Sequence, residues 1–334
     1  MKIIIPMAGR GSRLRPHTLT IPKPLLPIAG KPIVQRIVED LSASVQEGIE
    51  EVAFIIGDFG HEAEEKLQQI AKDVGAKCSI YYQEEPLGPA HAIQCAKDSL
   101  DGPCVVAFAD TLFRADFSFD TSADGIIWVQ KVEDPSSFGV VKTDADGIIT
   151  DFVEKSPVFV SDMAIVGIYF VKQATQLRDT IQHMLDNQIT DKGEFQITTA
   201  LELLKQGGTR FEAGQIDEWL DCGNKDNVIS THKRILEIKE DQTPIASSAR
   251  IENATIIPPC YIGENVLLRN TVVGPCVSIG NNSIVEHSVI VNSVVQDNTK
   301  ISNALLENSM IGNLVEYKGK KSDISLGDYS KYII

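Results

Sequence analysis

The first residues with an evident chemical potential are basic and lie close to the N-terminus. Residues 1–38 contain seven Lys or Arg and no Asp or Glu, whereas the whole chain of 334 residues has a net charge of −15. Gly9 and Gly11 lie within this basic segment, directly after the apolar stretch Lys2–Pro6. Glycines after a strand let the backbone approach a ligand and direct N–H groups at phosphates. The segment therefore predicts a pocket for a highly charged anion.

Two common phosphate-binding motifs do not fit this glycine loop. A dinucleotide fingerprint requires a third glycine at position 14, where the chain has Leu14. A P-loop requires Ser or Thr after a Gly-Lys pair, but Gly30-Lys31 is followed by Pro32. The loop must therefore bind phosphate in another way.

A longer pattern extends from Gly9 to Lys23 and reads G-x-G-x-R-x-x-x-x-T-x-x-x-P-K, with Arg13 and Thr18 at two of its fixed positions. It resembles the N-terminal signature of the sugar-1-phosphate nucleotidyltransferases. Other segments of that family have counterparts at Gln83–Ala90, Phe108–Asp110, Phe138–Val141, Glu154-Lys155 and Trp219–Gly223. Together with the C-terminal repeat described below, the chain resembles the long form of the glucose-1-phosphate thymidylyltransferases within that family.

The resemblance implies a role for individual residues. Arg13 and Lys23 would be catalytic, because they would neutralise charge on the reacting phosphates. Nucleotide binding is implied for Ala8, Gly9, Gly11, Ser12, Arg13, Lys23, Gln83 and Gly88. Binding of the sugar phosphate is implied for Gly139, Glu154, Lys155 and Gly167, and binding of Mg²⁺ for Asp110 and Asp221.

The implied reaction transfers a nucleotidyl group from dTTP or UTP to glucose-1-phosphate or a related sugar-1-phosphate, and releases pyrophosphate. The attacking phosphate oxygen is already ionised at neutral pH, so positioning and charge stabilisation supply most of the rate. Carboxylate oxygens such as those of Asp110 suit Mg²⁺. The side-chain amide of Gln83 offers an acceptor and two donors, and can therefore read the imide edge of uracil or thymine.

Strand-like and helix-like segments alternate over the first 240 residues. This alternation predicts a Rossmann-like α/β domain with a mostly parallel mixed sheet, covered on both faces. Asp110 follows a predicted strand, at the sheet edge where ligands bind. Predicted strands are Lys2–Pro6, Val52–Gly57, Cys78–Tyr82, Cys104–Ala109, Gly125–Lys131, Ile148–Val153 and Ala164–Val171, and predicted helices are Pro32–Ser44, Glu62–Lys72, Pro89–Ser99, Lys172–Asn187, Gln196–Gln206 and Asn227–Lys239.

After residue 244 the pattern changes, and aliphatic residues recur every five or six positions, beginning with Ile245, Ile251 and Ile257. Such spacing is typical of a solenoid, and its hexapeptide form resembles the left-handed parallel β-helix. We therefore predict a catalytic domain over residues 1–240 and a β-helix with a C-terminal cap over residues 245–334. The exposed coil faces favour assembly into a homo-oligomer.

Composition limits the remaining partners. The acidic chain is poorly suited to general nucleic-acid binding or to anionic membrane surfaces. No stretch reaches the ~18 apolar residues of a membrane span. The six cysteines form no C-x-x-C pair and no signal peptide is evident, which predicts reduced thiols in a cytoplasmic protein.

Three other functions remain open at this stage. The β-helix could carry an acetyltransferase site for amino sugar phosphates, with His287 as its base. A mannose-1-phosphate guanylyltransferase would share the same motifs and differ in base selection. A non-catalytic sensing subunit is also conceivable, although the presence of Lys23, Asp110 and Lys155 argues against it.

Overall fold

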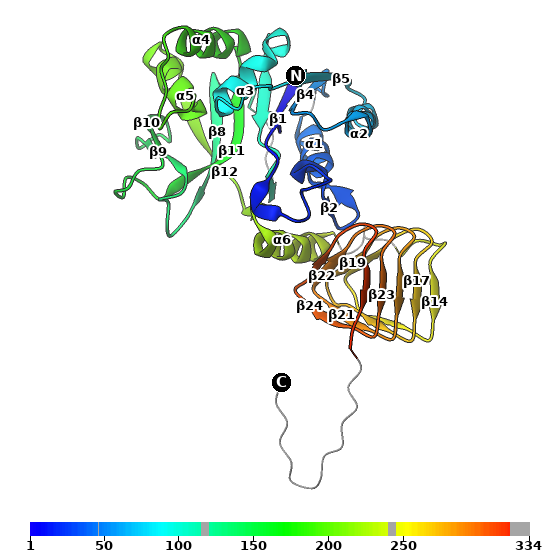
Figure 1. The fold of residues 1–334 in the computed structure, drawn as a ribbon. Coiled ribbons are helices and arrows are strands. Elements are labelled where there is room, and N and C mark those ends of the chain that lie inside the picture. Colours follow the sequence, from blue (N-terminus) through cyan, green and yellow to red (C-terminus); the bar gives the residue numbers. More distant parts are fainter. Residues whose placement is uncertain (46, 115–119, 240–244, 321–334) are drawn as a thin grey trace. The chain divides into compact units, whose positions relative to one another are not determined.

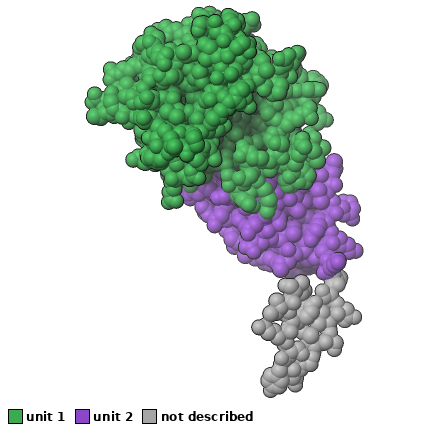
Figure 2. All heavy atoms as spheres, turned by 60° about the vertical axis from the view of Figure 1, so that its left-hand side comes forward, with its two compact units in different colours: residues 1–27, 31–228 green, residues 28–30, 229–334 purple. Residues whose placement is uncertain are grey.

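The computed structural model describes residues 1–45, 47–114, 120–239 and 245–320. The chain divides into two compact units, coloured separately in Figure 2. The first unit comprises Met1–Pro27 and Lys31–Val228. The second comprises Ile28–Gly30 and the residues from Ile229 onward, so it includes segments that the sequence analysis assigned to the first domain. The last residue of the predicted catalytic domain (240), the four residues between the two predicted domains (241–244) and the end of the predicted cap (321–334) lie outside the described residues.

The first unit is built on a nine-stranded mixed sheet (Figure 1). Its parallel half has the order β6-β1-β4-β5, and these strands span Cys104–Ala107, Lys2–Pro6, Glu51–Ile56 and Lys77–Tyr82. Strand β1 is buried throughout, because Ile3–Ile5 are apolar and the charge of Lys2 is paired with Glu51 at 3.2 Å. The carboxyl ends of these strands meet at one edge, where the glycine loop and Asp110 follow.

The other half of the sheet is largely antiparallel, because the long strand β11 (Met163–Val171) runs against β6, β8 and β9. Strands β8 (Gly125–Lys131), β9 (Gly139–Thr143), β10 (Ile149–Glu154) and β12 (Phe211–Gln215) complete the sheet. A separate ribbon pairs β7 (Thr111–Arg114) with β13 (Glu218–Asp221). A short hairpin joins β2 (Pro27–Ile28) to β3 (Lys31–Pro32).

Helices cover both faces of the sheet. Helices α3 (Pro89–Cys95), α4 (Ala174–Asp186) and α5 (Ile197–Gln206) pack together and share one core with the sheet, which contains Ile4 and Val106. Helices α1 (Ile33–Ser44) and α2 (His61–Asp73) pack against each other, and α2 also packs against β4 and β5. The predicted α/β fold is thereby confirmed, and the predicted helices match α1 to α5 closely; Lys97–Ser99, expected to continue α3, forms a separate 3-10 turn.

The second unit contains three parallel sheets that wind as a β-helix (Figure 1). This arrangement fits the predicted left-handed β-helix. Equivalent positions of successive coils are 17 residues apart at first and 16 apart later, which is shorter than three full hexapeptides. The first sheet contains β14 (Arg250–Glu252), β17 (Leu267–Arg269), β20 (Ile284–Glu286), β23 (Lys300–Ser302) and β26 (Glu316–Lys318). The second contains β15 (Thr255–Ile256), β18 (Val272–Val273), β21 (Val289–Val291) and β24 (Leu305–Glu307), and the third β16 (Cys260–Ile262), β19 (Val277–Ile279), β22 (Ser293–Val295) and β25 (Met310–Ile311).

The corners of the β-helix are occupied by residues in the left-handed backbone conformation. Most are asparagines, which tolerate this conformation well, and their side chains form ladders such as Asn253 to Asn270, 2.7 Å apart. His287 occupies one of these corners with φ of 48° and is exposed. His287 is therefore a turn residue of the coil, in line with Asn270 and Asn303.

Helix α6 (Lys225–Ile238) enters the second unit at Ile229. Its fully buried His232 places Nε2 2.7 Å from Oγ of Ser278 in strand β19. The structure thus joins the end of this helix to the β-helix core. None of the described helices is both long and apolar enough to cross a lipid bilayer.

Candidate active site

The glycine loop that follows β1 owes its shape to Gly11. This residue has φ of 67°, a conformation that favours glycine. A Cβ at Gly11 would lie 2.6 Å from Cβ of Lys23, and Oγ1 of Thr18 donates to the carbonyl of Gly11 at 2.8 Å. The threonine and the lysine of the sequence pattern therefore both lie against Gly11, which accounts for their place in the pattern.

Lys23 and Asp110 form an ion pair within this loop region. Nζ of Lys23 lies 3.1 Å from Oδ2 of Asp110. The lysine side chain is only 8% exposed, whereas that of Asp110 is 47% exposed. Burying an ammonium group is costly unless it is paired, and Asp110 provides that partner for Lys23. The ion pair therefore places a buried positive charge next to an accessible carboxylate.

The second predicted metal ligand reaches the same sheet edge through β-strand pairing. Strand β13 places Asp221 opposite Thr111 of β7, and the N–H of Cys222 donates to the carbonyl of Asp110 at 3.0 Å. The carboxylate of Asp221 accepts hydrogen bonds from the N–H of Gly223 at 2.9 Å and from Nδ2 of Asn227. Among the described residues, no group of three or more His, Cys, Asp or Glu forms a metal cluster. Any cation held here would need phosphate oxygens or water as further ligands, which suits Mg²⁺.

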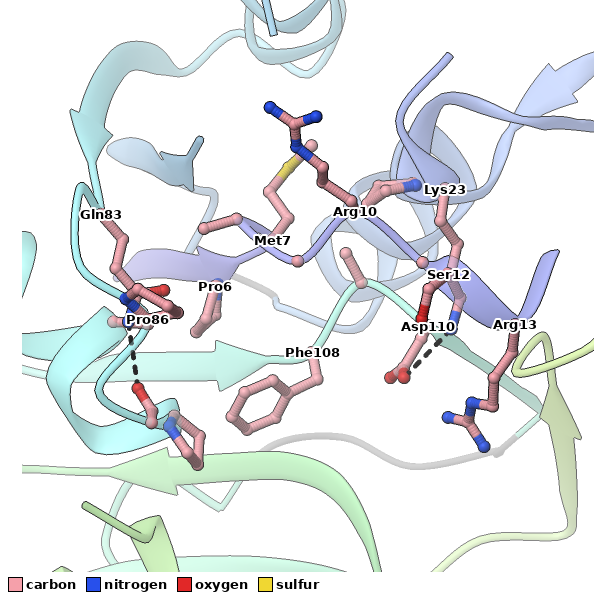
Figure 3. A pocket seen from close by; sticks show the side chains of 18 of the residues that line it. Pro6, Met7, Arg10, Ser12, Arg13, Lys23, Gln83, Pro86, Phe108 and Asp110 are labelled. Atoms are coloured by element: carbon pink, nitrogen blue, oxygen red, sulfur yellow. Dashed lines mark hydrogen bonds and ion pairs between the residues drawn. The ribbon is translucent and has the colours of Figure 1, made fainter. Parts of the chain in front are cut away.

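The glycine loop and the ends of the parallel strands line a cleft of about 490 Å³. Figure 3 shows Gln83 at one end of this cleft and Lys23, Asp110 and Arg13 at the other. All the residues for which nucleotide binding was predicted line the cleft: Ala8, Gly9, Gly11, Ser12, Arg13, Lys23, Gln83 and Gly88. The structure thus brings this whole predicted set together in one site.

The backbone around Gly88 is closely packed. Gly88 has φ of 122°, and an added Cβ would lie 2.7 Å from the backbone nitrogen of Phe195. The N–H of Phe195 donates to the carbonyl of Leu87 at 2.9 Å, and the N–H of Ala90 to the carbonyl of Phe195 at 2.9 Å. This turn is therefore held against the segment before α5, and Gly88 leaves no room for a side chain.

The residues predicted to bind the sugar phosphate form a second group that does not line this cleft. Glu154 pairs with Gly139 across β10 and β9, and an added Cβ at Gly139 would lie 3.0 Å from Oε2 of Glu154. Oγ1 of Thr198 donates to Oε2 of Glu154 at 3.0 Å, and Nζ of Lys155 lies 3.4 Å from Oε1. Gly167, in a bulge of β11, accepts a hydrogen bond from the N–H of Phe108 at 3.0 Å.

Several residues of the site were not found from the sequence. Arg10 and Glu194 line the cleft, and Arg10 could have been included because it belongs to the basic segment. Phe108 also lines the cleft; it lies in a segment matched to the family, but no role was assigned to it. The contacts of Asn227 and Thr198 depend on tertiary packing, so a single sequence contains no signal for them.

Comparison with known proteins identifies the family of the chain. Residues 2–238 match the family described as nucleotidyl transferase. The chain belongs to the nucleotidyl transferase family. The match covers nearly all of the first unit and both carboxylates of the candidate metal site, Asp110 and Asp221.

Individual nucleotidyl transferases resemble the chain over most of its length. A low-salt glycan biosynthesis nucleotidyltransferase of Haloferax volcanii is 31% identical, covering 90% of this chain and 89% of that protein. A glucose-1-phosphate thymidylyltransferase of Streptomyces antibioticus is 29% identical and covers 99% of both. A bifunctional protein GlmU of Methanococcus maripaludis is 28% identical, covering 93% of this chain and 77% of the longer relative.

A solved structure supports the fold. A UDP-glucose pyrophosphorylase crystallised with UDP-glucose aligns with a TM-score of 0.59 at 24% identity, over 71% of this chain and 98% of that one. Over that share of the chain, the fold is therefore the same as in a solved structure.

Proposed function

We propose that this nucleotidyl transferase transfers the nucleotidyl group of UTP or dTTP to glucose-1-phosphate or a related sugar-1-phosphate. The observation that supports this most is the single cleft in which the glycine loop, Arg13 and Lys23 lie at one end and Gln83 at the other. A nucleoside triphosphate has the same polarity, with phosphates at one end and a base at the other. The glucose-1-phosphate thymidylyltransferase relative, matched over its whole length, supports the choice of substrates.

The basic groups of the site address the repulsion between two anionic substrates. In the proposed step, a phosphate oxygen of the sugar-1-phosphate bonds to the α-phosphorus of the triphosphate, and the bond to pyrophosphate breaks in line. Arg13, which is exposed in the 3-10 turn Ser12–Leu14, would bind the leaving pyrophosphate. Lys23 lines the cleft, and its ammonium group is held in position by burial and by Asp110. It would therefore stabilise charge on the reacting phosphates without first having to become ordered.

We also propose that Asp110 and Asp221 bind Mg²⁺. Both are hard oxygen donors, and the pairing of β7 with β13 brings them to the same edge. A bound Mg²⁺ would neutralise charge on the triphosphate. Asn227 and the N–H of Gly223 orient the carboxylate of Asp221 by the hydrogen bonds described above.

The second group of residues is proposed to bind the sugar phosphate. Glu154 would accept hydrogen bonds from sugar hydroxyls, since Thr198 already orients its carboxylate at 3.0 Å. Lys155 has φ of 41° and a half-exposed side chain, so its ammonium group is available for the phosphate. Gly139 and Gly167 would leave room for the sugar ring.

The direct test is a panel of pyrophosphate-release assays with the purified protein and Mg²⁺. UTP, dTTP, CTP, ATP and GTP are each combined with the 1-phosphates of glucose, galactose, mannose and N-acetylglucosamine. We expect release with UTP or dTTP and glucose-1-phosphate. A strict requirement for GTP would contradict the pyrimidine assignment and favour a guanylyltransferase, and no release from any pair would contradict catalysis altogether.

The bifunctional alternative has some support from the GlmU relative. His287, the base that it would need, is a corner residue of the β-helix and lies in line with two asparagines. We therefore favour a single activity. Acetyl transfer from acetyl-CoA to an amino sugar phosphate, if present in the native protein and lost in His287→Ala, would overturn this preference.

Assembly and location complete the proposal. The second sheet of the β-helix exposes Val289 and Leu305, with 37% and 82% of their surface accessible, and we propose that such a face joins subunits of a homo-oligomer. The six cysteines form no disulfide, which is compatible with the proposed cytoplasmic location.

A further inference from the structure

The side-chain amide of Gln83 has a defined orientation. Its Nε2 donates to the carbonyl of Gly88 at 3.2 Å and lies 3.1 Å from Nδ1 of His91. A carbonyl oxygen only accepts hydrogen bonds, so the atom that faces Gly88 must be the amide nitrogen. The second N–H of this nitrogen then donates to Nδ1 of His91, which requires the neutral imidazole with its proton on Nε2.

The frame around this amide is fixed without the help of the Gln83 side chain. The N–H of Gln83 donates to the carbonyl of Ile56 at the end of β4, at 2.9 Å. Gly88 is held by the backbone of Phe195, as described above. His91 is half-buried in the first turn of α3, which begins at Pro89. The positions of the Gly88 carbonyl and of His91 Nδ1 are therefore determined by the surrounding structure. The Gln83 amide takes the orientation in which its nitrogen donates to both acceptors.

This orientation determines what Gln83 offers to a ligand. Both N–H groups of the amide are used within the protein, which leaves Oε1 as the group that can meet a ligand. Oε1 has no hydrogen-bond partner among the residues that the structure describes, and Gln83 lines the base end of the cleft (Figure 3). A ligand must therefore present an N–H to this oxygen.

The nucleobases differ in this respect. Uracil and thymine carry a hydrogen on N3 and guanine carries one on N1, so each can donate to Oε1. Cytosine N3 and adenine N1 have lone pairs instead, which would face the lone pairs of Oε1 when the base lies in the same position. These two bases can donate only through their exocyclic amino groups, so the ring would have to shift in the site before one of them could reach Oε1. A site whose polar group is left without its partner discriminates strongly against the wrong ligand.

We propose that His91 is a positioning residue that holds the Gln83 amide with its oxygen toward the base, so that the enzyme selects bases with a ring N–H over cytosine and adenine. The inference rests on the proposed nucleotidyl transfer for the identity of the ligand. His91 is not among the residues that line the cleft, so it acts through Gln83. Its removal should change the KM for the triphosphate and leave kcat nearly unchanged.

The test compares two substitutions that differ in one hydrogen-bond acceptor. In His91→Asn, the amide oxygen can take the place of Nδ1 as acceptor, whereas His91→Leu retains similar volume without any acceptor. The purified proteins are assayed with Mg²⁺, glucose-1-phosphate and either UTP or CTP. We expect His91→Leu to reduce the UTP-over-CTP ratio of kcat/KM about tenfold, through a higher KM for UTP, as the loss of one well-oriented hydrogen bond implies. His91→Asn should remain within about threefold of the native ratio.

Two results would overturn the role of His91. One is a native UTP-over-CTP ratio in His91→Leu, and the other is an equal loss in both variants. Thermal melting verifies that each variant is folded, and His91→Phe replaces His91→Leu if that variant does not fold.

The role of His91 can be separated from the proposed reaction. If the native protein releases no pyrophosphate from any substrate pair, the nucleotidyl transfer assignment fails, but calorimetric binding of UTP and CTP still tests His91. Native protein that binds CTP as tightly as UTP would overturn the inference. A UTP preference that disappears in His91→Leu and is retained in His91→Asn would support it.

Discussion

Lys23 illustrates how one residue combines a structural and a chemical role. Its side chain packs against the glycine loop at Gly11, and its ammonium group lies 3.1 Å from Asp110. A lysine on a long flexible side chain normally pays an entropic penalty when it orders on a ligand. Because Lys23 is already buried and paired, its charge is in place before the triphosphate binds.

Lys23→Ala should therefore reduce kcat/KM for pyrophosphate release by about 10²–10³-fold, since it removes a fixed charge beside the reacting phosphates. Lys31→Ala is a matched control, because Lys31 belongs to the same basic segment but is exposed and paired with Glu39 at 2.8 Å. The control should retain activity within twofold. Native activity in Lys23→Ala would show that the charge of Lys23 has no part in the reaction.

Gly11 is a second residue of this site, and its backbone conformation contributes to the stability of the protein. Gly11→Ala should destabilise the protein by about 1–2 kcal/mol, because the left-handed conformation is unfavourable with a Cβ, and the added atom would lie 2.6 Å from Lys23. Gly9→Ala is the matched control for stability, since a Cβ at Gly9 meets nothing within 4 Å. Thermal melting should show a lower Tm for Gly11→Ala only, and equal melting of the two variants would contradict this account.

At the scale of elements, the spacing of apolar residues in the sequence predicted most of the helices and strands of the first unit. The strand Gly125–Lys131 agrees with its prediction at both ends, and α1 begins one residue after its predicted start at Pro32. Strand pairing was not predictable in the same way. The ribbon of β7 and β13 joins Thr111 to Asp221, which are far apart in the sequence, and no local pattern indicates that register. The family resemblance predicted that the two proposed metal ligands lie together, but the strand pairing that brings them together emerged only from the structure. The contact of His91 with Gln83 also emerged only from the structure.

The edge of the sheet opposite the cleft is held by a buried carboxylate, Glu51, whose side chain is only 5% exposed. Burial alone would raise its pKa, but hydrogen bonds from Ser79, Ser99, Lys2 and Lys77 outweigh this effect and lower the pKa from 4.5 to about 2. These partners come from β1, β5 and the 3-10 turn Lys97–Ser99, so the carboxylate joins several elements at once.

The depressed pKa of Glu51 predicts a dependence of stability on pH. A carboxyl group with a lowered folded-state pKa stabilises the protein above its unfolded pKa, and this stabilisation is lost as pH falls from about 4.5 toward 2. The contribution is about 3 kcal/mol. Glu51→Gln should therefore be less stable than the native protein at pH 7, and the difference should shrink on acidification.

Urea unfolding at pH 7, 4.5 and 3 measures this effect. Glu50→Gln is the control, because Glu50 is the exposed neighbour of Glu51, and its substitution should leave the stability at each pH close to that of the native protein. If the difference in unfolding free energy between the native protein and Glu51→Gln were the same at all three pH values, the partners of Glu51 would not lower its pKa, and this account would be wrong.

At the scale of the whole molecule, charge is distributed unevenly. The basic residues of the N-terminal segment include Arg10, Arg13 and Lys23 of the cleft, whereas the chain as a whole has a net charge of −15. Acidic surroundings repel anions in general, and the positive cleft concentrates the potential that attracts a triphosphate. The β-helix differs again, because its first sheet exposes paired charges such as Arg269 with Glu252 and Glu286, and its second exposes aliphatic side chains.

This difference between the faces of the β-helix yields a prediction about assembly. Leu305 lies on β24 of the second sheet with 82% of its surface exposed, and a cluster of exposed aliphatic side chains is typical of a surface that binds another protein. Leu305→Lys should shift the protein to a smaller species, because a charge at a subunit contact would have to be buried without a partner.

Light scattering coupled to size-exclusion chromatography measures the mass of each species. Glu316→Lys, which places the same side chain on the charged first sheet, should leave the mass unchanged. A native protein that is monomeric at micromolar concentration, or an assembly that persists in Leu305→Lys, would exclude this face as the contact between subunits.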